Sequence, residues 1–373
     1  MSQVDKYELM RQKLKAGQHS PPKHKTVFEF LKIIWNEDDV DVLLHFEGVG
    51  KMASAKMIAE RAGMDEEKVE TILENLYKKL TIIKIEGMYG LVPLIPGIFE
   101  LYFAGGNDTE ENLKKAGIIF HKFLNKVYEG EKATRDQPMF LPKLPLGAKK
   151  TLIKIDETID MATQSSILPY ELVEELIDQN DYFAKVPCQC RMVGEYAGDP
   201  CTLAPSDVGC LAAGDPARTL VKHNMGEEMT KEEAIDYLKR ASEAGLIHNG
   251  GRLSGPSATL SICNCCPCHC PSVKAERNYR VRGVNPSNFE PVINNELCNK
   301  CEICMRKCPV HVIFHKWPSE ADSSDEAMVI KTEHCLGCGV CAVNCPEEAI
   351  KMVRVRDFVP PESSPLQKEL GLG

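Results

Sequence analysis

The sequence predicts an α+β protein built from several domains. Three observations lead to this prediction: apolar residues with helical spacing in the N-terminal part, a central part dense in cysteine, and a C-terminal segment in which one cysteine pattern occurs twice. A chain of 373 residues is long enough for two or three domains with cores of their own. The net charge of −9 argues against a general nucleic-acid binder and suits docking to a basic patch on a protein partner.

The 17 cysteines all lie from Cys188 onward. The first 20 residues are polar and lack the apolar stretch of a signal peptide, and the chain contains no run of about 18 apolar residues. We therefore expect a cytoplasmic protein without a membrane span. In a reducing compartment clustered thiols indicate metal ligands rather than disulfides.

Residues 1–25 are expected to form a polar tail that is helical at first and is then broken at 20–22, and residues 26–104 are expected to form the first domain. Within this domain, helical spacing over Ala53–Arg61 is followed by a second helix from Asp65, a natural N-cap, to Leu80. Alternating apolar residues over 81–92, interrupted by a turn, predict a β-hairpin. This order of helix, helix and hairpin resembles a winged-helix domain.

Residues 105–180 are expected to be a helical connecting region, with one helix from Glu111 and another opening at Pro169. Residues 181–285 form a cysteine-rich region that we interpret as an iron–sulfur region. Between its two cysteine groups, Thr230 and Glu233 form the capping box of a helix that ends at Gly245.

Residues 290–357 contain the spacing C-x-x-C-x-x-C-x-x-x-C-P twice. A cubane [4Fe–4S] cluster needs four thiolates, and spacings of three residues let one tight loop reach three corners while the fourth ligand comes from farther away. Zinc sites use pairs of C-x-x-C and fit this pattern poorly. A second alternative is that the clusters only stabilise the fold. Residues 358–373 are expected to form a flexible tail.

The repeated motif resembles that of bacterial two-cluster ferredoxins, which are compact α+β domains. The resemblance implies that the fourth cysteine of each motif ligates the other cluster. The first cluster would then take Cys298, Cys301, Cys304 and Cys345, and the second would take Cys335, Cys338, Cys341 and Cys308.

The central region holds nine further cysteines that predict one or two additional [4Fe–4S] clusters. Either each sequence group holds its own cluster, or two thiols from each group share one, and zinc remains an alternative. Adjacent cysteines such as Cys265 and Cys266 point in different directions and are not expected to serve one cluster. The first group is Cys188, Cys190, Cys201 and Cys210, and the second is Cys263, Cys265, Cys266, Cys268 and Cys270.

Three central segments together resemble ferredoxin-domain iron–sulfur proteins of anaerobes: Cys188–Arg191, Gly245–His248 and Ile262–Cys266. One interpretation of Arg191 is that it lies next to the cofactor, donates hydrogen bonds to cluster sulfur and raises the reduction potential of the cluster. The alternative is that Arg191 is an ordinary surface residue. His248 is expected to pack or cap rather than ligate. The position of His269 between two cysteines leaves its role as a ligand open.

These observations favour an electron-transfer protein or subunit that passes single low-potential electrons between a donor and a partner oxidoreductase. One alternative is an iron–sulfur reductase with its own substrate site, although no G-x-G-x-x-G motif after a strand and no Walker loop is present. Another is a redox-sensing, DNA-binding winged-helix regulator. The expected recognition helix, 65–80, has a net charge of −2, which would repel phosphate and disfavours this alternative.

Overall fold

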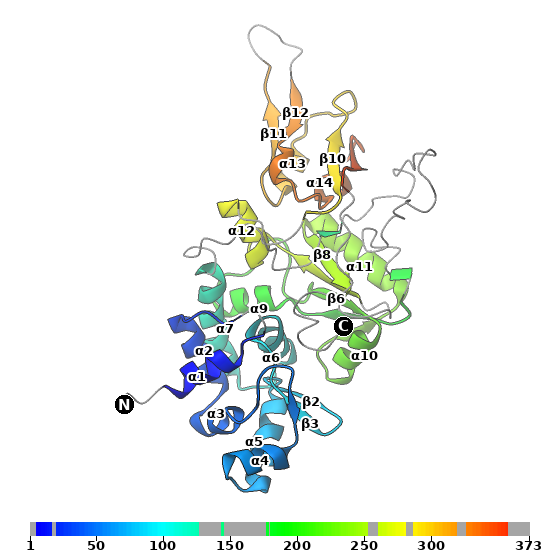
Figure 1. Ribbon diagram of the computed structural model, residues 1–373. Coiled ribbons are helices and arrows are strands. Elements are labelled where there is room, and N and C mark those ends of the chain that lie inside the picture. The colour runs from blue at the N-terminus through cyan, green and yellow to red at the C-terminus, as the bar shows by residue number, and fades with distance from the viewer. Residues whose placement is uncertain are drawn as a thin grey trace.

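The computed structural model describes most of the chain, and it arranges the chain as an N-terminal helical part, a central sheet and a C-terminal domain (Figure 1). The expected strand near residue 151, most of the helix expected from Pro169 and the expected tail 358–373 lie outside the described residues. In the part of the chain that is described, no helix has the length and apolar character needed to cross a membrane. The described ranges are 5–16, 20–126, 143–144, 177–178, 180–252, 260–280, 286–318 and 326–356.

The N-terminal part combines helices with a small antiparallel sheet of strand order β1-β3-β2. Its strands are β1 (Met52–Ala53), β2 (Ile83–Ile85) and β3 (Met88–Gly90). A single π-helical turn at Leu94–Ile98 precedes the last two helices. The helices are α1 (Lys6–Lys13), α2 (Lys25–Ile34), α3 (Glu37–Leu43), α4 (Ala55–Ala62), α5 (Glu66–Lys78), α6 (Phe99–Gly105) and α7 (Glu110–Lys126).

The local signals in this part are confirmed. Helix α4 ends at Gly63, whose φ of 63° is left-handed, and such a conformation costs glycine little. Asp65 caps α5, because its carboxylate accepts a hydrogen bond of 2.9 Å from the backbone N–H of Lys68. The expected hairpin is also present, with β2 and β3 paired around the turn at Glu86 and Gly87.

Two segments differ from expectation because each contributes to the N-terminal core. Helix α1 lies in the segment expected to be a polar tail, yet its Met10 is fully buried. The apolar residues of this segment recur at helical spacing and form one apolar face of the helix. The average composition of the segment is polar and does not reveal this face. Helix α7, expected in a connecting region, packs against α2, and its Phe120 ring stacks on Phe99 with centroids 4.3 Å apart.

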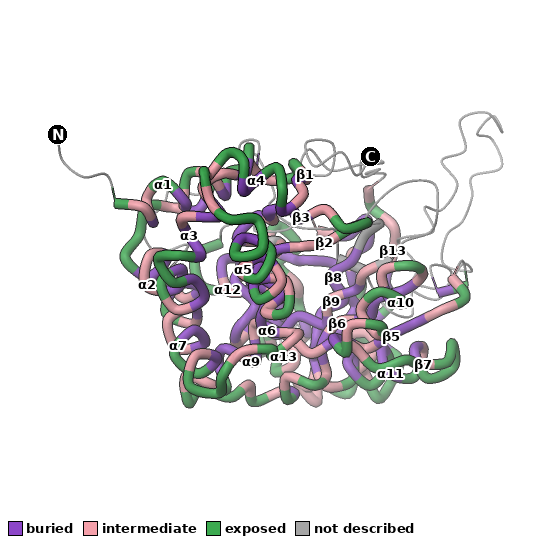
Figure 2. Tube along the Cα trace, turned by 90° about the horizontal axis from the view of Figure 1, so that it is seen from below, coloured by how far each residue is buried: buried purple, intermediate pink, exposed green. Residues whose placement is uncertain are grey.

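The central part is a six-stranded antiparallel sheet of order β4-β8-β9-β6-β5-β7. Buried residues concentrate along its middle strands (Figure 2). The capping box of Thr230 and Glu233 is confirmed at the start of α11, which ends at the left-handed Gly245. The strands are β4 (Lys143–Leu144), β5 (Phe183–Val186), β6 (Cys210–Ala213), β7 (Glu227–Met229), β8 (Ile247–Arg252) and β9 (Leu260–Cys265), and the helices are α9 (Gln189–Tyr196), α10 (Asp215–Lys222), α11 (Lys231–Ala244) and α12 (Pro271–Tyr279).

The C-terminal domain is built from two similar halves, each containing two strands and a short helix. Its strands pair across the halves, because β10 pairs with β13 and β11 pairs with β12. The β11–β12 hairpin points away from the central sheet (Figure 1). The first half holds β10 (Phe289–Ile293), α13 (Ile303–Lys307) and β11 (Ile313–Lys316), and the second holds β12 (Ala327–Ile330), α14 (Val340–Val343) and β13 (Ile350–Arg354).

Candidate metal centres

Two small cavities lie in the C-terminal domain, and each is lined by four cysteines. Each cavity takes three cysteines from one half of the domain and one from the other. Helices α13 and α14 contact each other, and Cys308 ends α13, so the fourth cysteine of one motif reaches the other motif's loop. The first cavity is lined by Cys308, Cys335, Cys338 and Cys341, and the second by Cys298, Cys301, Cys304 and Cys345.

The donors in these cavities suit an iron–sulfur cluster. Burial raises the pKa values of Cys304 and Cys335 to about 11, so their thiolates need a nearby positive charge such as a metal. Three backbone N–H groups point at cysteine sulfurs over 3.4 Å, as expected where sulfur carries negative charge. These groups are the N–H of Lys300 toward Cys298, of Val312 toward Cys308 and of Gly337 toward Cys335.

The β11–β12 hairpin closes both cavities with one of its faces. Ile313 and Ile330, which are cross-strand partners, line the first cavity, and Met328 lines the second. The next pair, Phe314 and Val329, points to the opposite face and is 38% and 39% exposed. The alternation along the strands therefore shields the cysteines with apolar side chains on one side.

Residues 297–349 match the family model of the 4Fe-4S dicluster domain. The chain carries a 4Fe-4S dicluster domain. The match covers this segment and no more of the chain, and the search of curated proteins found no match. The cysteines of both cavities lie within the matched residues, so the dicluster domain and the two cavities coincide.

Outside the dicluster domain, the structure divides the nine central cysteines differently from their order in the sequence. Cys201 leaves the first sequence group and joins Cys266 and Cys268 beside His269. The other six form a six-thiol group, which consists of Cys188, Cys190, Cys210, Cys263, Cys265 and Cys270. This grouping mixes thiols of both sequence groups, which is closer to the alternative in which the groups share a metal site than to one cluster per group. Cys265 and Cys266 fall into different groups, as expected.

Antiparallel pairing explains how the six-thiol group assembles. Strand β6 lies beside β9 in a register that sets Cys210 next to Cys263, with their sulfurs 3.3 Å apart. Cys263 and Cys265 share one face of β9 because they are two residues apart. The thiol of Cys265 in turn interacts with Cys270, the residue immediately before α12.

The six-thiol group adjoins the dicluster domain. Cys265 and Cys270 belong to the same buried core as Cys304 and Cys308, and Ile247 and Val273 fill the space beside them. The central cysteines and the dicluster cysteines therefore share one continuous apolar interior.

Arg191 is fully buried, which excludes the interpretation as a surface residue. Its guanidinium donates to the backbone carbonyl of Asn264 over 2.9 Å, to that of Pro205 over 3.1 Å, and to that of Val208. A hydrogen bond from Cys190, together with the charge of Arg191, lowers the pKa of Cys188 to about 7. Arg191 thus ties strand β9 to the 205–208 loop, and within the six-thiol group its charge favours the thiolate of Cys188.

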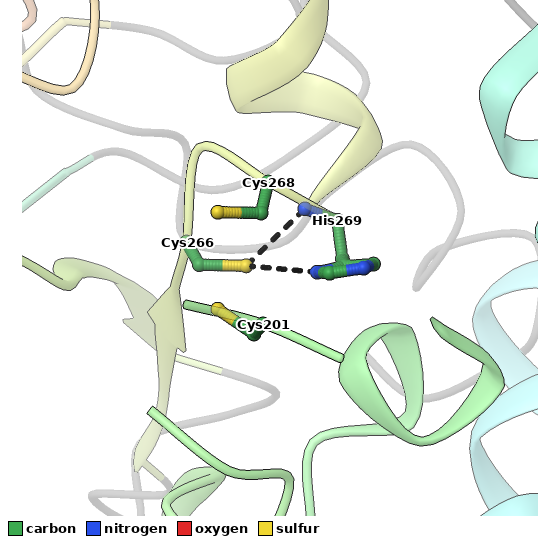
Figure 3. A group of neighbouring side chains, drawn as sticks. All are labelled: Cys201, Cys266, Cys268 and His269. Carbon is green, nitrogen blue, oxygen red and sulfur yellow. Dashed lines mark hydrogen bonds between the residues drawn. The ribbon is translucent and has the colours of Figure 1, made fainter. Parts of the chain in front are cut away.

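Two histidines of the central region have different surroundings. His248 is buried on β8, its Nδ1 lies 2.8 Å from Oδ1 of Asn264, and burial lowers its pKa to about 4, as expected of a packing residue. His269, whose role the sequence left open, lies among three thiols with Nδ1 3.8 Å from Sγ of Cys266 (Figure 3). The backbone carbonyl of Asp199 contacts the same ring, and no sequence motif had indicated a role for Asp199.

Proposed function

We propose that this chain is an electron-transfer iron–sulfur protein or subunit that passes single low-potential electrons between a donor and a partner oxidoreductase. The observation that carries the proposal is the pair of four-cysteine cavities within the segment that matches the 4Fe-4S dicluster domain. When bound, a [4Fe–4S] cluster accepts and releases one electron at a time.

The residues of the dicluster domain have three roles in this proposal. The eight cysteines hold two clusters, three ligands from one motif and one from the other in each case. Backbone N–H groups, such as that of Gly337, donate to the thiolates and make reduction less costly. The apolar face of the β11–β12 hairpin keeps water from the clusters, and solvent access is one of the factors that set a potential.

The six-thiol group would hold a further [4Fe–4S] cluster that serves as a relay or as the point where electrons enter. Support comes from the shared core of Cys265 and Cys270 with Cys304 and Cys308, since close packing favours electron exchange. Four of the six thiols suffice for one cluster, so two would remain as neighbours that tune it.

The N-terminal part is proposed as a winged-helix-like domain that binds a protein partner. Support comes from the order α3, β1, α4, α5, β2, β3 and from the sheet order β1-β3-β2. Helix α5 is capped by Asp65 and has Glu66 and Glu67 in its first turn. Farther along α5, Glu74 interacts with Lys84 and Tyr89, so these two side chains are not available to bind phosphate. The acidic helix disfavours DNA.

The test uses the full chain purified without air. We expect about eight irons from the dicluster domain and about four more from the six-thiol group, with equal sulfide. After reduction by dithionite, EPR should show the interacting signals of two nearby clusters, and the reduced protein should transfer electrons to a one-electron acceptor dye. Protein that contains zinc in place of this iron, or that is not reversibly bleached, contradicts the proposal.

The same preparation separates the two alternatives. Turnover of a substrate without any added partner would indicate a reductase with its own active site. A shift of duplex DNA in a gel, which depends on the redox state of the protein, would indicate a regulator. An oxidoreductase that co-purifies with the chain supports electron transfer.

A further inference from the structure

Four side chains of the central region converge on one point outside the six-thiol group. The ligand atoms of Cys201, Cys266, Cys268 and His269 all lie within 4.8 Å of one another. Figure 3 shows the sulfur of Cys266 between the other two sulfurs and the histidine ring. Cys266 follows β9, Cys268 and His269 lie in the turn before α12, and Cys201 comes from the loop after α9.

We propose that these four residues bind a single Zn²⁺ ion in a tetrahedral Cys₃His site. Sulfur and nitrogen ligands at about 2.3 and about 2.0 Å from one ion stand roughly 3.5 to 3.8 Å apart on a tetrahedron. The distance of 3.8 Å between Sγ of Cys266 and Nδ1 of His269 is close to the roughly 3.5 Å that this geometry gives for a sulfur–nitrogen pair. The site is independent of the proposed electron transfer, because zinc does not change its oxidation state.

The spacing of the ligand atoms argues against a cluster at this site. The four thiolates of a cubane each bind a different iron, so their sulfurs stand apart around the cluster, whereas ligands of one ion converge. The structure describes all eight cysteines of the dicluster domain. None of them belongs to a group of three or more ligand atoms that lie within 4.8 Å of one another. The molecule therefore contains both arrangements, and these four residues have the convergent one.

The surroundings of His269 prepare its Nδ1 for a metal. Its Nε2 lies 2.8 Å from the backbone carbonyl of Asp199, so Nε2 carries the proton and Nδ1 keeps a lone pair that faces the thiols. This contact is possible because residue 194 is a glycine, since a Cβ there would lie 2.5 Å from the ring. Both His269 and Cys266 are at most 3% exposed, which excludes water as a competing ligand on their side.

Two of the three thiols also lie next to hydrogen-bonding groups outside the site. The backbone N–H of His269 donates to Sγ of Cys266 over 3.2 Å, and the hydroxyl of Thr202 lies 3.8 Å from Sγ of Cys268. A closed set of four protein ligands without an open position is typical of structural zinc.

Zinc at this place would join three segments that are distant in sequence. The loop with Cys201, the end of β9 and the start of α12 would be held together beside Cys270, a member of the six-thiol group. The ion would thereby stabilise the geometry of the six-thiol group and the position of α12.

The test is metal analysis of the anaerobically purified full chain and two matched cysteine variants. We expect about one zinc per chain in the unmodified protein. In Cys201→Ser, zinc should fall close to zero while iron and the EPR of the dicluster domain stay unchanged. The control is Cys210→Ser, which alters a half-buried thiol of the six-thiol group and should keep zinc.

Two results from the metal analysis overturn the proposal. One is the absence of zinc from unmodified protein even when zinc is supplied during expression. The other is a loss of about four irons in Cys201→Ser with zinc unchanged, which would assign these residues to a cluster. If Cys201→Ser does not fold, His269→Ala retains all three thiols and should release zinc to a chelator at least tenfold faster. An unchanged release rate in His269→Ala would also contradict the site.

Discussion

The dicluster domain and the central region are both rich in cysteine, yet their cysteines are organised by different means. In the dicluster domain, short spacings within one loop bring three cysteines together, and the contact of α13 with α14 adds the fourth. In the central region, strand pairing and a loop combine cysteines that are up to about eighty residues apart, such as Cys188 and Cys265. Local spacing therefore predicts ligand sets only where the ligands share a loop.

The largest expected effect concerns the crossed ligand set of the dicluster domain. Cys308→Ser should remove the cluster built on Cys335, Cys338 and Cys341, although Cys308 belongs to the other motif. Iron should fall by about four per chain, and the EPR interaction between the two clusters should vanish. The matched variant Cys345→Ser should affect the cluster on Cys298, Cys301 and Cys304 instead. If Cys308→Ser removes that cluster and spares the other, the crossed assignment is wrong.

Arg191 should show how strongly the central region depends on a residue that is not a metal ligand. Arg191→Lys keeps the charge but cannot donate to three carbonyls at once, and it should lower the free energy of unfolding by about 4 kcal/mol. The exposed pair of Arg240 and Asp236 offers a control, and Arg240→Lys should change stability by less than about 0.5 kcal/mol. Thermal unfolding would measure both, and a negligible effect of Arg191→Lys would contradict its structural role.

Substitutions at two left-handed glycines allow a comparison between the dicluster domain and the N-terminal part, which contains no cysteine. Gly337 and Gly63 have nearly equal φ of 64° and 63°, but only at Gly337 would a Cβ strike backbone, 2.1 Å from the Phe289 carbonyl oxygen. Gly63→Ala should cost about 1 kcal/mol from conformation alone. Gly337→Ala should cost about 3 kcal/mol and lower the iron content. Equal costs for the two variants would show that the close approach does not matter.

The smallest effect is expected at the half-buried Glu100 of α6 in the N-terminal part. Burial raises the pKa of Glu100 to about 7, against a partial opposing effect of the Gly97 N–H, so the neutral form is favoured in the folded protein. Its contribution to stability is complete below about pH 4.5 and is lost as the pH rises through 7. Relative to Glu100→Gln, the unmodified chain should lose roughly 2 kcal/mol between pH 5 and pH 8.

Chemical denaturation of both proteins across this pH range would measure the difference, since other titrating groups cancel. Parallel curves for the two proteins would show that Glu100 is not perturbed.

Many local features could be predicted from the sequence because neighbouring residues decide them. The N-cap at Asp65, the stop at Gly63 and the capping box of Thr230 with Glu233 each depend on contacts within four residues. The repeated cysteine motif likewise predicted a 4Fe-4S domain, since its spacing is set by the cofactor that three of its residues surround.

The remaining features depended on contacts between distant segments. Nothing near Arg191 in the sequence indicates that it would be buried against carbonyls from two other segments. Nothing near Cys201 indicates that it would leave its sequence neighbours for Cys266 and His269. The register of β6 against β9 and the path of the loop after α9 decide these groupings, and such long-range packing has no short-range signal in the chain.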